Sequence, residues 1–150
     1  MLRLVQRKNN MRCLGIDYGR RRIGLALSVP TLLIASPLII IENRGLKKTL
    51  TQIMDIIQKN DVGQIVVGLP LHANGDESEM SQEARRFGLA FVTLGFPVEF
   101  VDERYTSLEA ESIIGKDSQS KNLIDKVAAS IILQISLDER RKALNESKNH

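Results

Sequence analysis

The hydrophobic pattern of the chain changes at Gly45, and this change constrains the fold more than any other feature. Before it, three short apolar runs follow one another through short connections, at 12–17, 23–28 and 33–41. Short connections favour antiparallel neighbours, so these runs predict a three-stranded meander. Pro37 cannot donate a ladder hydrogen bond, which favours an edge or bulge position for the third run.

After Gly45 the chain alternates between helical and strand patterns, which is typical of parallel crossovers. Apolar residues at helical spacing predict helices over 46–57 and 78–94, and apolar runs predict strands at 64–69 and 98–101. The capping-box spacing of Thr106 and Glu109 predicts a short helix over 106–115, and a last helix is expected over 122–141. The element order is therefore βββαβαβαα. We expect an α/β domain with a five-stranded mixed sheet, strand order 3-2-1-4-5, flanked by helices.

The length of 150 residues corresponds to about one domain. We expect a basic N-terminal extension over 1–10, a single domain over 11–142 and a polar tail over 143–150; the alternative for the extension is that translation starts at Met11. No apolar run reaches the roughly 18 residues of a spanning helix. Cys13 has no partner for a disulfide, and the N-terminus lacks the apolar block of a secretory signal. The sequence predicts a cytoplasmic protein without membrane contact.

Positive charge is concentrated in the first 24 residues, where seven basic side chains stand against one acid, Asp17. The net charge of the whole chain is only +3. A local basic patch suits a polyanion such as nucleic acid, with a solvated arm as the alternative. Two histidines and one cysteine are too few for a typical zinc site. Any metal would therefore bind to carboxylates.

Three carboxylates follow elements whose ends meet at one edge of the predicted sheet. Asp17 ends the first strand, Glu103 follows the fifth, and Asp125 lies in the first turn of the last helix. Reactive groups in α/β sheets collect beyond the carboxyl ends of parallel strands. Converging carboxylates repel one another and need a cation, and oxygen-only ligands favour Mg²⁺ or Mn²⁺. We expect two such ions for in-line attack on a phosphodiester. Asp17 would bridge both ions, and Glu103 and Asp125 would each complete the coordination of one of them.

Each of these residues also has a purely structural interpretation. Asp17 can bond its own backbone in a turn. Glu103 can form a surface ion pair with its neighbour Arg104. Asp125 can cap the last helix or complement its dipole. The basic turn at 20–22 can simply be solvated.

Four segments resemble the successive signature blocks of the YqgF family, also called RuvX: LGIDYGRRRIGLALS, IVVGLPL followed by NGDES, VDERYTSLEAE and DKVAASIILQ. They extend from Arg12 to about Asp138 in the order that the family has. The resemblance implies a ribonuclease H-like fold. It also implies a nuclease, because the family was first described as Holliday junction resolvases and is now mostly assigned to the 5′ end of precursor 16S rRNA.

The resemblance extends to individual site residues. The acidic residues of the family fall on Asp17, Glu103 and Asp125, which are thereby implied to be the catalytic residues and metal ligands. Basic and polar positions of the family fall on Arg22, Arg104 and Thr106, which we interpret as groups that bind the substrate or support the ligands. Together with Arg20, the arginines are expected to hold phosphates without reading bases.

One position departs from the family pattern. The second strand of the family usually ends Ser-Asp, whereas here Ser28 is followed by Val29, so we expect no fourth, outer carboxylate. A sugar-kinase or actin-like ATPase opens with a similar strand but needs a second domain that 150 residues cannot supply. A non-catalytic RNA-binding module is the other alternative, but the presence of all three acids, Asp17, Glu103 and Asp125, favours a catalytic protein. RNA versus junction DNA, and monomer versus homodimer, stay open at this stage.

Overall fold

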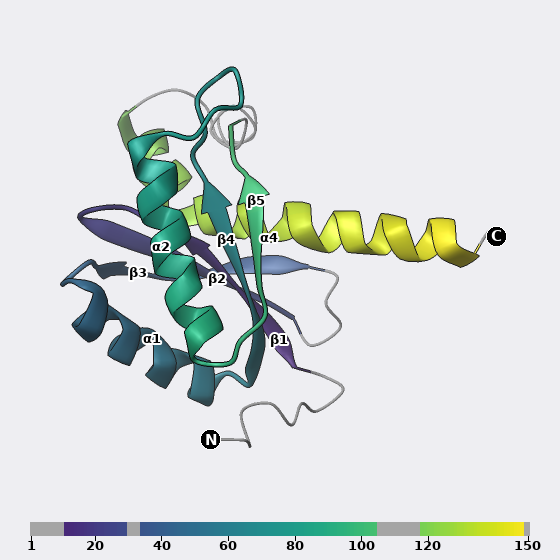
Figure 1. Cartoon of the computed structure of the whole chain (residues 1–150), viewed down its shortest axis with the longest axis horizontal. Helices are drawn as coiled ribbons and strands as arrows, with labels where there is room; N and C mark the ends of the chain where they lie inside the picture. Colours follow the sequence, from purple (N-terminus) through teal and green to yellow (C-terminus); the bar gives the residue numbers. More distant parts are fainter. Residues whose placement is uncertain (1–10, 30–33, 105–117, 149–150) are drawn as a thin grey trace.

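The computed structural model describes residues 11–29, 34–104 and 118–148, and in the last helix it describes the side chains of 127–147. The strands are β1 (Arg12–Asp17), β2 (Arg22–Ser28), β3 (Ala35–Glu42), β4 (Val62–Leu69) and β5 (Val98–Asp102), and the helices are α1 (Leu46–Lys59), α2 (Glu79–Thr93) and α4 (Ser118–Lys148) (Figure 1). The strands form one five-stranded sheet in the order β3-β2-β1-β4-β5. The predicted strand order is confirmed.

The first half of the sheet is antiparallel and the second half is parallel. β2 pairs antiparallel with both β1 and β3, whereas β4 pairs parallel with both β1 and β5. β3 is an edge strand, and its register against β2 shifts where Leu25 pairs with Ile39 and Ala26 pairs with Pro37. The missing N–H of Pro37 is tolerated at such a position, as the sequence predicts.

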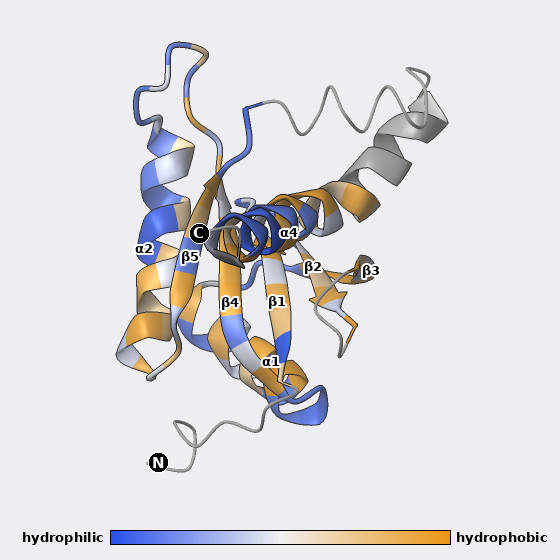
Figure 2. Ribbon diagram, turned by 90° about the vertical axis from the view of Figure 1, so that its right-hand side faces the viewer, coloured by the Kyte–Doolittle hydropathy of each residue, from blue (hydrophilic) through white to orange (hydrophobic). Residues whose placement is uncertain are grey.

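The helices cover the two faces of the sheet. α1 and α2 pack on one face around a large apolar cluster that includes Ile53 and Phe91, and α4 crosses the other face (Figures 1 and 2). A Cβ at Gly15 would stand 2.8 Å from the backbone oxygen of Ala129 and 2.8 Å from Leu133 Cβ. The absence of a side chain at Gly15 therefore lets α4 lie directly on β1.

α4 is longer than the helix predicted over 122–141, because it begins at Ser118 and continues to Lys148. Arg140 bonds α4 to the sheet, because it donates to Glu99 Oε1 at 2.9 Å and to Gln64 Oε1 at 3.0 Å. Residues 141–147 are exposed and extend beyond the sheet (Figure 1). No glycine or proline interrupts them, so the polar end of the chain continues the helix.

Two predicted segments, the basic extension over 1–10 and the helix over 106–115, lie outside the described residues. Among the helices that the structure describes, none has the length and apolar character needed to cross a membrane.

Candidate active site

Asp17 and Glu103 come together at the carboxyl ends of the parallel strands. Asp17 is two residues after Gly15, so strand alternation places it on the α4 face of the sheet. Glu103 follows β5 directly, and its backbone N–H donates to the Leu69 carbonyl at 3.2 Å. Its carboxylate lies across Gly68, because a Cβ there would stand 2.5 Å from Glu103 Oε2.

Glu103 lies near enough to Asp17 for the two carboxylates to affect each other's charge. Burial raises the pKa of Glu103 to about 8, and the negative charges of Asp17 and Asp102 contribute to the same shift. Asp17 is itself half-buried. Two carboxylates are thus held in one partly dehydrated place, where their mutual repulsion would be relieved by a proton or by a cation.

The donor chemistry of this pair fits a hard divalent cation, because both side chains offer carboxylate oxygens. The described side chains contain no cluster of three or more histidine, cysteine, aspartate or glutamate residues around one point. The side chain of the third predicted ligand, Asp125, lies outside the described residues, although its backbone belongs to α4. It stands four residues before Ala129 and seven before Ile132, both buried against the sheet. Helical spacing therefore puts position 125 on the sheet-facing side of α4.

A surface pocket of about 250 Å³ adjoins Asp17. It is lined by Asp17, Tyr18, Gly19, Arg21, Arg22, Gly24 and Ile40. Arg22 is exposed and lies on the same face as Asp17, because Asp17 pairs with Gly24 and side chains alternate along β2. The pocket thus combines a carboxylate with cationic side chains. Of the other predicted substrate contacts, Thr106 lies outside the described residues.

Arg20 points to a different neighbour from Arg22. Its Nε donates to Glu83 Oε2 at 2.8 Å, and its Nη2 lies 3.6 Å from Glu79 Oε2, both on α2. The pair with Glu83 is the main reason that the pKa of Arg20 is raised. These pairs join residues far apart in the chain, so no local sequence pattern predicts them. The role of Arg20 as a phosphate contact stays a prediction.

Arg104 binds Asp102. Its Nε donates to Asp102 Oδ2 at 2.8 Å and its Nη2 lies 2.7 Å from the same atom, which lowers the pKa of Asp102. Its Nη1 also donates to the Ala73 carbonyl at 3.1 Å. Arg104 therefore ties the end of β5 to the loop between β4 and α2, a connection that the sequence analysis missed.

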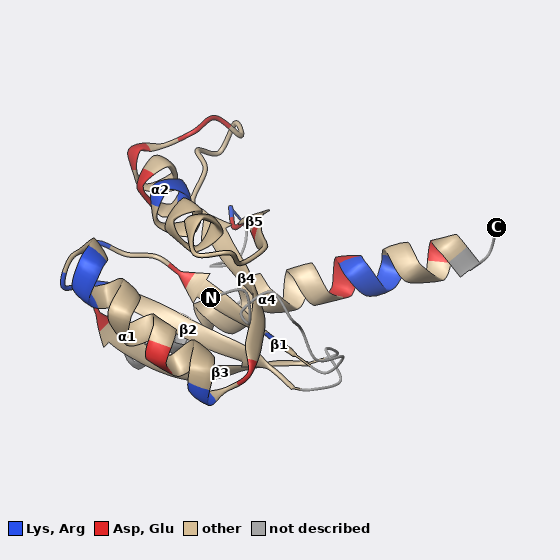
Figure 3. Ribbon diagram, turned by 60° about the horizontal axis from the view of Figure 1, so that its bottom comes forward, with Lys and Arg blue, Asp and Glu red and all other residues tan. Residues whose placement is uncertain are grey.

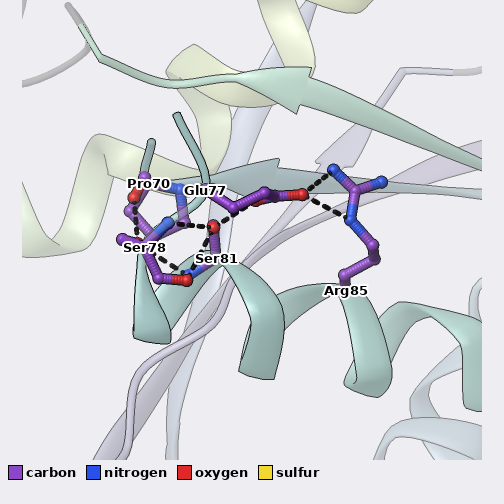
Figure 4. Close-up of polar contacts among 5 residues, drawn as sticks. All are labelled: Pro70, Glu77, Ser78, Ser81 and Arg85. Atoms are coloured by element: carbon purple, nitrogen blue, oxygen red, sulfur yellow. Dashed lines mark hydrogen bonds and ion pairs between the residues drawn. The ribbon is translucent and has the colours of Figure 1, made fainter. Parts of the chain in front are cut away.

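The other end of this loop is fixed at the start of α2 (Figure 4). Ser78 Oγ accepts from the Ser81 N–H at 2.9 Å and donates to the Pro70 carbonyl at 2.6 Å. Ser81 donates to Glu77, which also accepts from Arg85 Nε at 2.9 Å. The Ser78 N–H also donates to Ser81 Oγ at 2.8 Å, which completes a capping box, and the helix start predicted at Ser78 is confirmed. The loop is thus held at both ends beside Glu103.

Tyr18 forms part of the wall of the site. Its ring lies 5.0 Å from the ring of Phe87 on α2, at an interplanar angle of 41°. The ring is thus turned toward the α2 side of the sheet, whereas Asp17 next to it lies on the α4 side. Tyr18 thus lies at the edge of the sheet between the α2 side and the α4 side.

The chain is similar to known proteins in sequence and in fold. Residues 11–139 match the RuvX family, described as Holliday junction resolvase. A protein of Chloroflexus aurantiacus named "Putative pre-16S rRNA nuclease" is 40% identical over 144 residues, covering 93% of this chain and 94% of the relative. A protein of Syntrophomonas wolfei with the same name is 41% identical over 133 residues, covering 85% of this chain and 94% of the relative.

Among solved structures, Thermus thermophilus RuvC in complex with a Holliday junction substrate superposes with a TM-score of 0.51 at 17% identity. The match covers 87% of this chain and 96% of that chain. A second Thermus thermophilus RuvC structure gives the same TM-score at 14% identity. These matches confirm the fold that the sequence predicts, and the family match confirms the resemblance: the chain belongs to the RuvX family.

Proposed function

We propose that this protein is a metal-dependent nuclease that hydrolyses phosphodiester bonds at the edge of the sheet where Asp17 and Glu103 lie. The observation that carries the proposal is the burial of Glu103 across Gly68, beside Asp17, with a pKa of about 8. A protein gains nothing in stability from holding two acids together in this way. Such an arrangement is typical of a site built for a cation.

Asp17 and Glu103 would hold the cation through their carboxylate oxygens, and we assign Asp125 as the third ligand from its position on α4. Bound Mg²⁺ or Mn²⁺, in one or two positions, supplies an activated water and stabilises the leaving oxygen of the phosphodiester. Gly68 leaves the space in which the Glu103 carboxylate reaches toward Asp17. The buried contacts of α4 around Ala129 fix the helix that carries Asp125.

Cationic groups beside the carboxylates would hold the substrate. Arg22 lines the same pocket as Asp17, which supports its assignment to the phosphate next to the cleaved bond. Arg20, from the basic turn, and Thr106, from the resemblance to the family, are assigned to neighbouring phosphates. Arg104 is fixed by Asp102 and Ala73, so we assign it to holding the β4–α2 loop against the substrate. Contacts of this kind position a nucleic acid without reading its sequence.

The preferred substrate is precursor 16S rRNA, because the relatives at 40% and 41% identity are named pre-16S rRNA nucleases. Cleavage at its 5′ end, in the cytoplasm during ribosome biogenesis, follows from the resemblance to the family and is part of the proposal. The second candidate is branched DNA, because the family is described as Holliday junction resolvase. Cleavage of a junction would call for a homodimer with two symmetric sites, whereas trimming of an RNA end is compatible with a monomer.

The deciding experiment offers both substrates to the same protein. A labelled precursor 16S rRNA 5′ leader and a four-way DNA junction are incubated with wild type and with Asp17→Asn, in Mg²⁺, in Mn²⁺ and in EDTA. We expect cleavage of the RNA leader by wild type in either metal, and no cleavage in EDTA or by the variant. Selective cutting of the junction would assign the protein to DNA, and cleavage in EDTA would refute the metal-dependent mechanism.

A further inference from the structure

A group of exposed cations lies beyond the candidate active site, at the same end of the molecule. The turn between β1 and β2 is bonded to the segment before α1, because Asn43 Nδ2 donates to the Gly19 carbonyl at 2.9 Å and Asn43 N–H donates to the Arg21 carbonyl at 2.8 Å. Arg21 is therefore brought next to the first turn of α1, which carries Lys47 and Lys48. Figure 3 shows the basic segments of this turn and of the start of α1 side by side.

The charge of this surface is not cancelled by neighbouring acids. Arg44 pairs with Glu42 at 3.4 Å, and Arg20 pairs with Glu83 and Glu79. Within the described part of the chain, no ion pair involves the exposed side chains of Arg21, Lys47, Lys48 or Arg86. We call these four residues the basic ridge.

Two pockets connect the ridge to Asp17. The pocket at Asp17 includes Arg21 and Tyr18. A second pocket, of about 280 Å³, is lined by Tyr18, Asn43, Gly45, Leu46, Glu83, Arg86 and Phe87. Tyr18 belongs to both, so the surface is continuous from the carboxylate on one face of the sheet to Arg86 and the start of α1 on the other.

We propose that the basic ridge binds the phosphodiester backbone of the substrate nucleic acid at a distance from the cleaved bond, where the strand continues from Asp17 across Tyr18. This inference rests on the proposed function, because it takes the cleaved phosphate to lie at Asp17. The ligand chemistry is the repeating phosphate of RNA or DNA, which several separated cations match better than a single anion does. The ridge extends the binding surface beyond Arg20, Arg22, Arg104 and Thr106.

Lys47 and Lys48 offer the sharpest test, because they stand in the first turn of α1, where positive charge opposes the helix dipole. Their replacement by glutamine keeps helix propensity and leaves folding unharmed. The test variant is Lys47→Gln with Lys48→Gln. The matched control is Lys59→Gln with Lys142→Gln, which removes the same charge from the other end of α1 and from the exposed part of α4.

Binding is measured by fluorescence anisotropy in EDTA, which prevents cleavage, over about 50 to 200 mM salt. The probes are an RNA duplex and a DNA duplex of the same sequence, each in a long form and in a form too short to reach from Asp17 to the ridge. For a long duplex we expect the double variant to lower the slope of log affinity against log salt by about two. Its affinity deficit relative to wild type should then shrink about tenfold across the salt range. The control should follow wild type, and no variant should change binding of the short duplexes.

The outcomes separate this inference from the proposed function. If the double variant loses affinity for the long RNA alone, or for the long DNA alone, the proposed role of the basic ridge is supported and the nucleic acid that it binds is identified. A wild type that cleaves nucleic acid, with equal slopes for the double variant and the control, would overturn the ridge and leave the nuclease standing. A wild type with ridge-dependent binding but no cleavage of any substrate would support the ridge and refute the nuclease.

Discussion

Glu103 lies across Gly68, where a Cβ would stand 2.5 Å from Glu103 Oε2 and 2.5 Å from Ile132 Cδ1. Both atoms are at the far ends of side chains, so they can move aside when the space is filled. The Glu103 carboxylate, however, would then be displaced from Asp17. The glycine at the carboxyl end of β4 therefore sets the geometry of the acid pair more than the stability of the sheet.

Gly68→Ala is expected to reduce metal-dependent cleavage by at least about tenfold, with a loss of stability of about 1 kcal/mol. Gly15→Ala is a comparison for stability only, because a Cβ there meets the backbone oxygen of Ala129 at 2.8 Å, which cannot move aside, and would also shift the helix that carries Asp125. That variant should lose about 1 to 3 kcal/mol of unfolding free energy. Cleavage assays and urea melts measure the two effects. Full activity of Gly68→Ala would contradict the role assigned to the glycine.

Asp17→Asn tests the carboxylate at the end of β1. The amide has nearly the same volume but is a poorer ligand for a hard cation, so cleavage should fall by orders of magnitude while the protein stays folded. Circular dichroism and thermal melts check folding, and the precursor rRNA assay checks activity. A folded Asp17→Asn protein with wild-type activity would refute the metal-based mechanism.

The fold could be predicted because its elements are marked by local chemistry. The alternation of Ile23 to Ser28, the helical spacing of the 46–57 segment and the position of Pro37 all agree with the observed strands and helix. The continuation of α4 beyond Arg141 was missed, because an exposed polar segment without glycine or proline has the same composition as a tail. Its helical form extends the part of α4 that Arg140 fixes on the sheet.

The site could be predicted only in part. The strand-end rule brings Asp17 and Glu103 to one edge, as observed. The partner of Arg104 could not be deduced, since Asp102 and Glu103 are both acidic neighbours and only the orientation of their side chains at the end of β5 decides which one faces the guanidinium. The pairing of Arg20 with α2 depends on packing between segments about sixty residues apart in the chain, for which local sequence carries no signal.

The pKa of Glu103 makes the metal-free protein sensitive to pH. The group titrates near 4.5 in the unfolded chain and near 8 in the folded one, so the folded state binds more protons between these values. Its contribution to stability is therefore intact below about pH 4.5 and is lost as pH rises toward 8. In EDTA, the unfolding free energy of wild type relative to Glu103→Gln should fall by up to a few kcal/mol across this window.

Urea melts of both proteins at several pH values measure this difference. The contributions of the other titrating groups cancel, because both proteins contain them. Saturating Mn²⁺ should abolish the dependence, because a bound cation takes the place of the proton. A difference between the two proteins that stays constant from pH 5 to 8 would show that Glu103 is not desolvated beside Asp17.

Asp125 is tested by the response of stability to metal. If its carboxylate joins Asp17 and Glu103, Asp125→Asn removes a repelling charge, so the metal-free variant should be as stable as wild type or more stable. Wild type should gain about 2.7 kcal/mol when Mn²⁺ is at a hundred times its dissociation constant, because the ion binds only the folded state. In Asp125→Asn this gain and the cleavage activity should both decrease.

The interpretation of Asp125 as a helix-end residue is wrong, because α4 begins at Ser118 and Asp125 stands seven residues inside it. A residue that only supports the interior of the helix gives the opposite pattern. Asp125→Asn would then lower the melting temperature by the same amount with and without Mn²⁺, because the carboxylate would stabilise the helix independently of any bound ion. Lys142→Gln, on the exposed part of α4, is the control for a charge change on the same helix that should alter neither quantity. Melts of wild type and both variants, at fixed pH and rising Mn²⁺, separate the two roles. A wild-type melting temperature that does not change in millimolar Mn²⁺ would leave Asp125 as a residue that only supports α4, and would refute the metal site.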